Sequence, residues 1–235
     1  QRIWRCNHIS YVSKMDKISE PERERIISQA KFAVNDEPIG WFDQLYGMAG
    51  RDSTIIPWAR MAPNPKMMNW VEKNCHTGNV LIIGCGLGDD AIWLKSIGLS
   101  VTAFDISEHC IEWCKDRFPN SKVEWCVGDI LHPNPEWYEN FDLIVEIHIL
   151  QAIPGGGIRE RAAEQMPKLL RKNGIMLCIG RLDDGHQTIQ PPPWPLKEAW
   201  LRESFAMLTL IEFTPFRNED SLDVARYCAA WQKQV

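Results

Sequence analysis

Short apolar runs rich in β-branched residues alternate with longer stretches of helical periodicity between Asn79 and Gly180. This alternation is typical of βαβ units, whose parallel strands form a sheet that helices cover on both faces. The predicted strands span Asn79–Ile83, Ser100–Asp105, Val123–Cys126, Asp142–Glu146 and Ile175–Gly180. The predicted helices between them span Asp89–Ile97, Glu108–Phe118 and Arg159–Leu170. The pattern therefore predicts a doubly wound, mostly parallel sheet of the α/β class.

The alternation of apolar runs and helical stretches ends at Gly180. The run Pro191–Pro195 excludes a helix interior or a central strand, because proline fixes φ and lacks the amide donor. Beyond it, a helix is predicted over Leu196–Ser204, and two strand-like runs over Leu208–Phe213 and Val224–Trp231. These elements complete a single predicted domain.

The segment Ile39–Trp70 is crowded with aromatic residues, methionines and prolines. We expect it to form a cap over one edge of the sheet. A charged helical pattern over Met15–Ala33 precedes it, and residues 1–14 are interpreted as an upstream extension. One domain is therefore predicted over residues 1–235, with extension and cap over 1–70 and the α/β core over 71–235.

Charge and hydropathy restrict the function. The formal net charge of −5 leaves no general basic surface for a phosphate backbone, which disfavours a nucleic-acid partner. No run approaches the roughly 20 apolar residues that span a bilayer, and no secretory signal precedes the helical pattern. We expect a cytoplasmic protein, a monomer or homodimer, with no membrane partner.

Eight cysteines are scattered along the chain, mostly within apolar runs. A chain of this size needs no disulfide staples, so we expect reduced thiols. Cys110 and Cys114 share one face of a predicted helix, but no CxxC pair or histidine cluster accompanies them. Buried packing is expected there, and no metal site.

The sharpest motif is a buried strand that runs into three alternating glycines, Gly84, Gly86 and Gly88, and then into a helix. Glycine permits positive φ and lets a ligand approach the backbone, and the helix start offers free N–H groups. Asp105 ends the next strand about 20 residues later, where a carboxylate can accept hydrogen bonds from ribose hydroxyls. A ligand-free turn and a solvated aspartate are the alternatives, but the pair together favours a nucleoside-type cofactor.

The glycine spacing distinguishes two cofactor classes. Dinucleotide folds prefer G-x-G-x-x-G/A, whereas this turn reads G-x-G-x-G with Asp89 at the sixth position. A carboxylate there would face a pyrophosphate at the helix N-terminus, which is electrostatically unfavourable. A cationic sulfonium cofactor, S-adenosylmethionine, raises no such objection.

Several motifs between Trp41 and the C-terminus carry a family resemblance. They are Ile56–Ala59 with Pro65 and Trp70, Gly84–Asp90, Asp105–Ser107, Gly128–Ile130, Val145–Glu146, Gln151–Pro154, Gly180–Arg181 and Pro192–Leu196. Through them the chain resembles the class I S-adenosylmethionine-dependent methyltransferases, and more narrowly the thiopurine, tellurite-resistance and plant halide/thiol methyltransferase-like branch. The resemblance implies a Rossmann-like sheet of seven strands with the last one antiparallel.

The resemblance also implies roles for cofactor-binding residues. Gly84, Gly86 and Gly88, with Cys85 between them, would line the methionine and ribose part of the cofactor. Asp105 would hold the ribose hydroxyls. Asp129 would meet the adenine amino group between Ile106 and Ile130, although Asp129 could instead be a turn residue. Many class I enzymes carry an acidic residue before the glycine turn, where this chain has Ile82-Ile83, so Asp90 is a candidate for a partial substitute.

Glu146 and His148 follow the fourth predicted strand at the edge where such folds place chemistry. Either could orient or deprotonate an acceptor, and Glu146 is also a candidate cofactor contact; the alternative is that both are ordinary polar residues. Gln151 and Arg181 are candidate substrate contacts, and a salt bridge is the alternative for Arg181. Trp58 and Trp194 are candidate aromatic covers of the site: Trp58 over the sulfonium, by cation–π contact, and Trp194 over the substrate. Most tryptophans nevertheless serve packing.

The predicted function is methyl transfer from S-adenosylmethionine to a small-molecule acceptor. A thiol, selenol, tellurium or halide acceptor is favoured by the resemblance, and such nucleophiles need no strong base. The alternatives are methylation of oxygen or nitrogen, a non-catalytic cofactor-binding module and, more distantly, a dehydrogenase.

Overall fold

The computed structural model describes residues 39–75, 77–186 and 191–234, together with Pro21, Arg25 and Ser28. Those three isolated residues are helical. The rest of the predicted helix Met15–Ala33 and the extension 1–14 lie outside the described residues.

Seven strands form one sheet in the order β3-β2-β1-β4-β5-β7-β6. Neighbours within β3, β2, β1, β4 and β5 are parallel, whereas β7 runs antiparallel to both β5 and β6. The strands are β1 (Asn79–Ile83), β2 (Ser100–Asp105), β3 (Glu124–Val127), β4 (Phe141–Ile147), β5 (Leu170–Arg181), β6 (Thr209–Asn218) and β7 (Ser221–Gln232). The predicted α/β class, the mostly parallel seven-stranded sheet and its antiparallel strand are confirmed.

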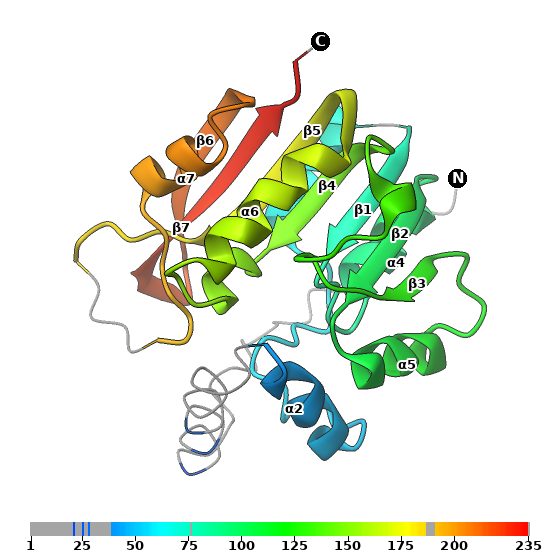
Figure 1. Ribbon diagram of the computed structural model, residues 1–235. Helices are drawn as coiled ribbons and strands as arrows, with labels where there is room; N and C mark the ends of the chain where they lie inside the picture. The colour runs from blue at the N-terminus through cyan, green and yellow to red at the C-terminus, as the bar shows by residue number, and fades with distance from the viewer. Residues whose placement is uncertain are drawn as a thin grey trace.

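The helices cover both faces of this sheet. They are α2 (Trp41–Ala49), α3 (Pro65–Asn74), α4 (Asp89–Ser96), α5 (Glu108–Arg117), α6 (Ile158–Leu169) and α7 (Glu198–Ser204), with the short 3-10 helices η2 (Pro135–Trp137) and η3 (Leu150–Ala152). Figure 1 shows α6 and α7 together on one face of the sheet. None of the helices in the described ranges is long and apolar enough to cross a membrane.

Alternation along β1 explains the two layers. Leu81 and Ile83 enter one buried cluster with α6 and α7, whereas Val80 and Ile82 enter a second cluster with α3, α4 and α5. A strand that is apolar on both faces is expected where helices cover both sides of a parallel sheet. The core therefore lies on either side of β1, β4 and β5, and this fixes the carboxyl edge where the site is built.

The largest differences from the predicted boundaries lie in two regions. Helix α6 ends at Leu169, and Leu170 already pairs with Phe141 of β4, so β5 starts at Leu170 rather than at the predicted Ile175. Strands β6 and β7 extend beyond the predicted runs and form a hairpin. Most of the added residues are polar and none of them is buried, so hydrophobicity did not mark them as strand.

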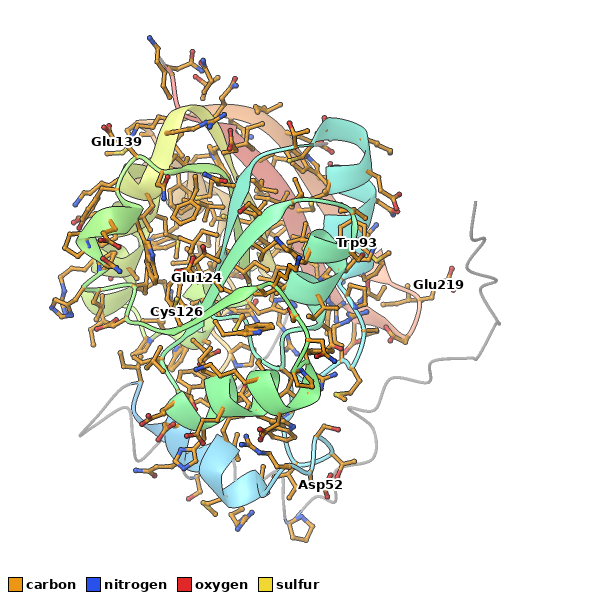
Figure 2. All side chains as sticks on the ribbon, turned by 90° about the vertical axis from the view of Figure 1, so that its right-hand side faces the viewer. Asp52, Trp93, Glu124, Cys126, Glu139 and Glu219 are labelled. Atoms are coloured by element: carbon orange, nitrogen blue, oxygen red, sulfur yellow. The ribbon has the colours of Figure 1, made fainter. Side chains whose placement is uncertain are left out.

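The segment before α3 gathers aromatic side chains at the carboxyl edge of the sheet. Trp41, Leu45 and Tyr46 of α2 pack with Trp113 of α5 in a third buried cluster. Figure 1 shows α2 below the edge at which β7 begins and the parallel strands end. In Figure 2, Asp52 beside α2 lies at the opposite end of the molecule from Glu139, which precedes β4. An aromatic cap is thus present at this edge, while the division between cap and core at residue 70 stays a prediction.

Candidate active site

The turn after β1 has the backbone that the glycine pattern predicts. Gly84, Gly86 and Gly88 have φ of +61°, +52° and +85°. A Cβ on Gly84 would overlap the Ile149 side chain, and one on Gly88 would lie 2.6 Å from the Trp125 ring. The turn therefore requires glycine both for its conformation and for close approach.

Asp105 is bound directly to this turn. Its two carboxylate oxygens accept hydrogen bonds from Gly86 N and Ser107 N, each at 3.1 Å. Burial raises the pKa of Asp105 to about 6, against the opposing effect of these two N–H donors. Because β1 and β2 are adjacent parallel strands, their carboxyl ends bring the turn and the carboxylate together, as predicted.

Three cysteine thiols lie close to the backbone of the glycine turn. Cys110 Sγ and Cys114 Sγ are each 3.0 Å from the carbonyl oxygen of Gly86, and Cys85 Sγ lies 3.6 Å from it. All three are buried free thiols, so the expected packing role of Cys110 and Cys114 holds. Hydrogen bonds from Cys110 and Cys85 lower the pKa of Cys114 to about 5. Within the described ranges, no set of three or more His, Cys, Asp or Glu side chains is placed to bind a metal.

Asp129 follows β3, beside the end of β2. One of its oxygens accepts from Leu131 N at 2.8 Å, and the other lies 2.9 Å from His132 Nδ1. Ile130 is buried in the core cluster, whereas Ile106 is only half-buried. Asp129 therefore has the hydrogen bonds of a turn residue, and its proposed contact with adenine stays a prediction.

Asp90 lies in the first turn of α4. Its Oδ1 accepts a hydrogen bond of 2.6 Å from the backbone N of Asn64, the residue that caps α3. Burial raises the pKa of Asp90 to about 6. The structure thus ties one oxygen of Asp90 to the α3 start, which leaves its cofactor role a prediction.

Glu146 is the penultimate residue of β4, on the face covered by α6. Its Oε1 accepts hydrogen bonds from Ile149 N at 2.6 Å and Leu150 N at 3.1 Å, while its Oε2 is buried and has no hydrogen-bond partner among the described residues. Burial raises the pKa of Glu146 to about 7. The carboxyl group therefore holds the turn that follows β4 and can exchange a proton near neutral pH.

His148 has φ of +68°, a strained conformation for a residue with a Cβ. Its Nδ1 is buried and without a partner among the described residues. Burial and the nearby Arg181 lower the pKa of His148 to about 4, so the ring is neutral at pH 7. Both predicted catalytic residues, Glu146 and His148, thus lie at the carboxyl end of β4, and each has one buried polar atom without a hydrogen-bond partner among the described residues.

Gln151 joins the predicted substrate residues to one another. Its side-chain oxygen accepts from Arg181 N at 2.6 Å, and its backbone carbonyl accepts from Trp194 N at 2.8 Å. Gln151 is buried and Trp194 is half-buried. The structure brings these three residues together, but it commits the Gln151 oxygen to the backbone.

Trp58 lies in the aromatic cap. Its Nε1 donates a 2.7 Å hydrogen bond to the Tyr46 hydroxyl, and its ring meets those of Trp41 and Phe42 edge-on. A Cβ placed on Gly86 would lie 3.6 Å from the Tyr46 hydroxyl oxygen. Trp58 is thus connected to the glycine turn through Tyr46.

Sequence reasoning missed three groups at this edge: Tyr46, Asp43 and Arg159. Asp43 of α2 accepts a 2.7 Å hydrogen bond from the hydroxyl of Ser107, two residues after Asp105. The apolar spacing of Trp41, Leu45 and Tyr46 would have indicated a helical face, but the contact with Gly86 depends on tertiary packing. Arg159 was used only as a helix boundary, since nothing local marks it as buried.

Comparisons with known proteins find a matching family and several relatives. The family described as Thiopurine S-methyltransferase (TPMT) matches residues 52–232. A probable thiol methyltransferase 2 of Arabidopsis thaliana is 30% identical over 133 residues, which cover 54% of this chain and 58% of that protein. Thiocyanate methyltransferase 1 of Brassica oleracea is 27% identical over 128 residues, 53% of this chain and 56% of that protein. The chain spans about half the length of these curated relatives.

Solved structures share the fold at low identity. The 1,6-didemethyltoxoflavin-N1-methyltransferase of Burkholderia thailandensis, with S-adenosylhomocysteine bound, has a TM-score of 0.62 at 16% identity and covers 93% of this chain and 92% of its own. The N-methyltransferase NodS of Bradyrhizobium japonicum has a TM-score of 0.61 at 21% identity, over 81% of this chain and 96% of its own. With the match over residues 52–232, these findings confirm the resemblance: the chain belongs to the thiopurine S-methyltransferase family of class I S-adenosylmethionine-dependent methyltransferases.

Proposed function

We propose that this chain transfers a methyl group from S-adenosylmethionine to a small-molecule acceptor whose reacting atom is a soft nucleophile: a thiol or selenol, tellurium, or a halide. The observation that carries the proposal is the three-glycine turn joined to Asp105 through Gly86. The thiol and thiocyanate methyltransferases among the relatives support the soft acceptor.

The residues around the turn suit this cofactor. The positive φ of the three glycines keeps side chains out of the turn, so that a ligand can lie against the backbone. Asp105 would hold the ribose hydroxyls, and the aromatic rings of Tyr46 and Trp58 would face the positive sulfonium. The carboxylate and the rings favour a cation over a pyrophosphate.

The bound cofactor supplies a methyl group already activated by the sulfonium, so the protein's task is to position the acceptor and exclude water. The cap formed by Trp41, Tyr46 and Trp58 would shield the reacting atoms from solvent. Neutral His148 could accept a hydrogen bond from an acceptor that still carries its proton. Glu146 fixes the 149–150 turn and, with a pKa of about 7, could take that proton.

Methylation of oxygen or nitrogen is the second candidate. The observation that favours it is the pair of polar atoms, Glu146 Oε2 and His148 Nδ1, that are buried without partners among the described residues. An alcohol or amine needs a general base, which these groups could provide.

The test measures S-adenosylhomocysteine formation with iodide, 2-mercaptoethanol, a phenol or a primary amine as acceptor. Iodide carries no proton, so its rate is expected to stay flat from pH 6 to 8. Turnover with only the phenol or amine, rising over this range and lost in His148→Ala or Glu146→Gln but kept in the exposed Glu164→Gln, would favour the second candidate. Cofactor binding without product from any acceptor would indicate a non-catalytic module. A cytoplasmic location and a monomeric or homodimeric state stay predictions.

A further inference from the structure

Arg159 is a buried cation at the start of α6. Its side chain is 8% exposed, and its Nε donates a 2.9 Å hydrogen bond to the carbonyl of Ile153. The guanidinium carbon lies 5.9 Å from the centre of the Trp194 ring and 5.7 Å from that of Trp200. Two tryptophans thus enclose the charged group and hold it away from water.

One nitrogen of the Arg159 guanidinium is left available as a hydrogen-bond donor. Arg159 Nη2 is buried and has no hydrogen-bond partner among the described residues. None of the ion pairs in the described ranges includes Arg159, and the neighbouring Glu160 accepts a 2.6 Å hydrogen bond from Gly157 N. Glu160 favours the charged guanidinium electrostatically but forms no ion pair with it, and burial has the larger, opposite effect and lowers the pKa of Arg159. The surroundings of Arg159 therefore favour the binding of an anion.

Arg159 also lies beside the proposed acceptor site. The hydrogen bond from Trp194 N to Gln151 O joins one of the two enclosing tryptophans to η3, directly after Glu146 and His148. The surroundings are cationic: Arg181 pairs with Arg226 across β5 and β7, and both arginines, with Arg60, oppose protonation of His148. An anionic acceptor would be attracted to this edge of a protein whose overall charge is negative.

We propose that Arg159 binds a carboxylate carried by the methyl acceptor, so that the chain selects small acceptors with a carboxylate near the nucleophilic atom. A guanidinium suits a carboxylate because its hydrogen bonds are charge-assisted and its geometry is fixed by the planar group. The two tryptophans exclude water and strengthen the interaction. This inference rests on the proposed function, because it names a part of the acceptor.

The experiment compares mercaptoacetate with 2-mercaptoethanol, two thiols of similar size of which only the first carries a carboxylate. The ratio of their kcat/KM values is measured for the wild type, Arg159→Met, Arg159→Lys and Arg202→Met. Arg202 is an exposed arginine of α7 paired with Glu198, so its variant controls for loss of a positive charge nearby.

Arg159→Met is expected to lower the ratio at least tenfold through KM for mercaptoacetate, while the ratio in Arg202→Met stays at the wild-type value. Arg159→Lys should retain part of the preference, because the charge remains. An unchanged ratio in a folded Arg159→Met protein would overturn the proposal and assign the free Nη2 to a buried water.

A second measurement uses the wild-type protein only. Propionate is titrated into the complex with S-adenosylhomocysteine by calorimetry, with propionamide as the neutral control. Saturable binding of propionate alone supports the proposal even if no thiol is methylated, in which case the proposed function fails separately. Equal or absent binding of both compounds overturns it, whether or not Arg159→Met folds.

Discussion

At the scale of single residues, the sequence indicated those candidate site residues that are marked by the local backbone conformation or by their place at a strand end. Gly84, Gly86 and Asp105 could be identified because positive φ at a strand-to-helix turn and a carboxylate at the next strand end are local features. The sequence also placed Glu146 and His148 at the correct edge. It could not show that Glu146 Oε1 would hold Ile149 and Leu150, because that contact depends on how the chain turns after β4.

Gly84→Ala should cost more stability than Gly98→Ala. Both glycines have positive φ, at +61° and +98°, so backbone strain lowers the free energy of unfolding by about 1 to 3 kcal/mol in each alanine variant. A methyl at residue 84 would also overlap Ile149, whereas one at residue 98 meets nothing within 4 Å, which adds about 1 to 3 kcal/mol of overpacking. Urea denaturation measures the two free energies of unfolding. Equal losses would show that Ile149 does not restrict the turn.

Glu146 should make the ligand-free protein lose stability as the pH rises. Its pKa is raised from 4.5 to about 7, so the folded state binds the proton more tightly than the unfolded chain. The resulting stabilisation is complete below pH 4.5 and is lost as pH rises through 7, by about 3 kcal/mol. Denaturant unfolding of Glu146→Gln at pH 5 and pH 8 should lack this component, whereas Glu164→Gln keeps it. The same pH dependence in Glu146→Gln and the wild type would assign the component to another group.

At the scale of elements, β1 to β4 were predicted to within one residue at each end because each is a short apolar run between turn residues, whereas β5 begins five residues before its predicted start. The cap was predicted from its aromatic composition, but its helices α2 and α3 were not delimited. Their faces are completed by partners from other elements: α2 packs on α5, and α3 packs on the sheet beside α4. The hairpin of β6 and β7 exceeded its predicted length because backbone pairing, rather than burial, holds its outer part.

The cap should contribute directly to cofactor binding. Trp58→Ala removes both the ring near the turn and the hydrogen bond to Tyr46, so we expect the dissociation constant for S-adenosylmethionine to rise about tenfold, in line with a contribution of 1 to 2 kcal/mol. Trp93 of α4, which Figure 2 shows well away from Asp52 and the cap, provides the control. Calorimetry on Trp93→Ala should give the wild-type constant. If both variants bind equally well, the aromatic cap only packs.

At the scale of the whole molecule, one sheet brings the separate motifs to one edge. The turn after β1, the end of β2, the end of β4 and the segment around Trp194 are distant in sequence, yet the parallel strands align all of their carboxyl ends. This convergence follows from the predicted topology, so the location of the site was predictable. The charge of the site was not predictable. Arg159, Arg181 and Arg226 lie near it although the chain has a net charge of −5, and only the three-dimensional arrangement shows this.

The most direct test of the account is a calorimetric titration of the ligand-free protein with S-adenosylhomocysteine, for the wild type, Asp105→Asn and Asp116→Asn. Asp116 is an exposed carboxylate of α5 that pairs with Arg51. We predict saturable binding of one molecule per chain, weakened at least tenfold in Asp105→Asn and unchanged in Asp116→Asn. Absence of binding to the folded wild type, or equal binding by all three proteins, would contradict the assignment of the glycine turn and Asp105 as the cofactor site.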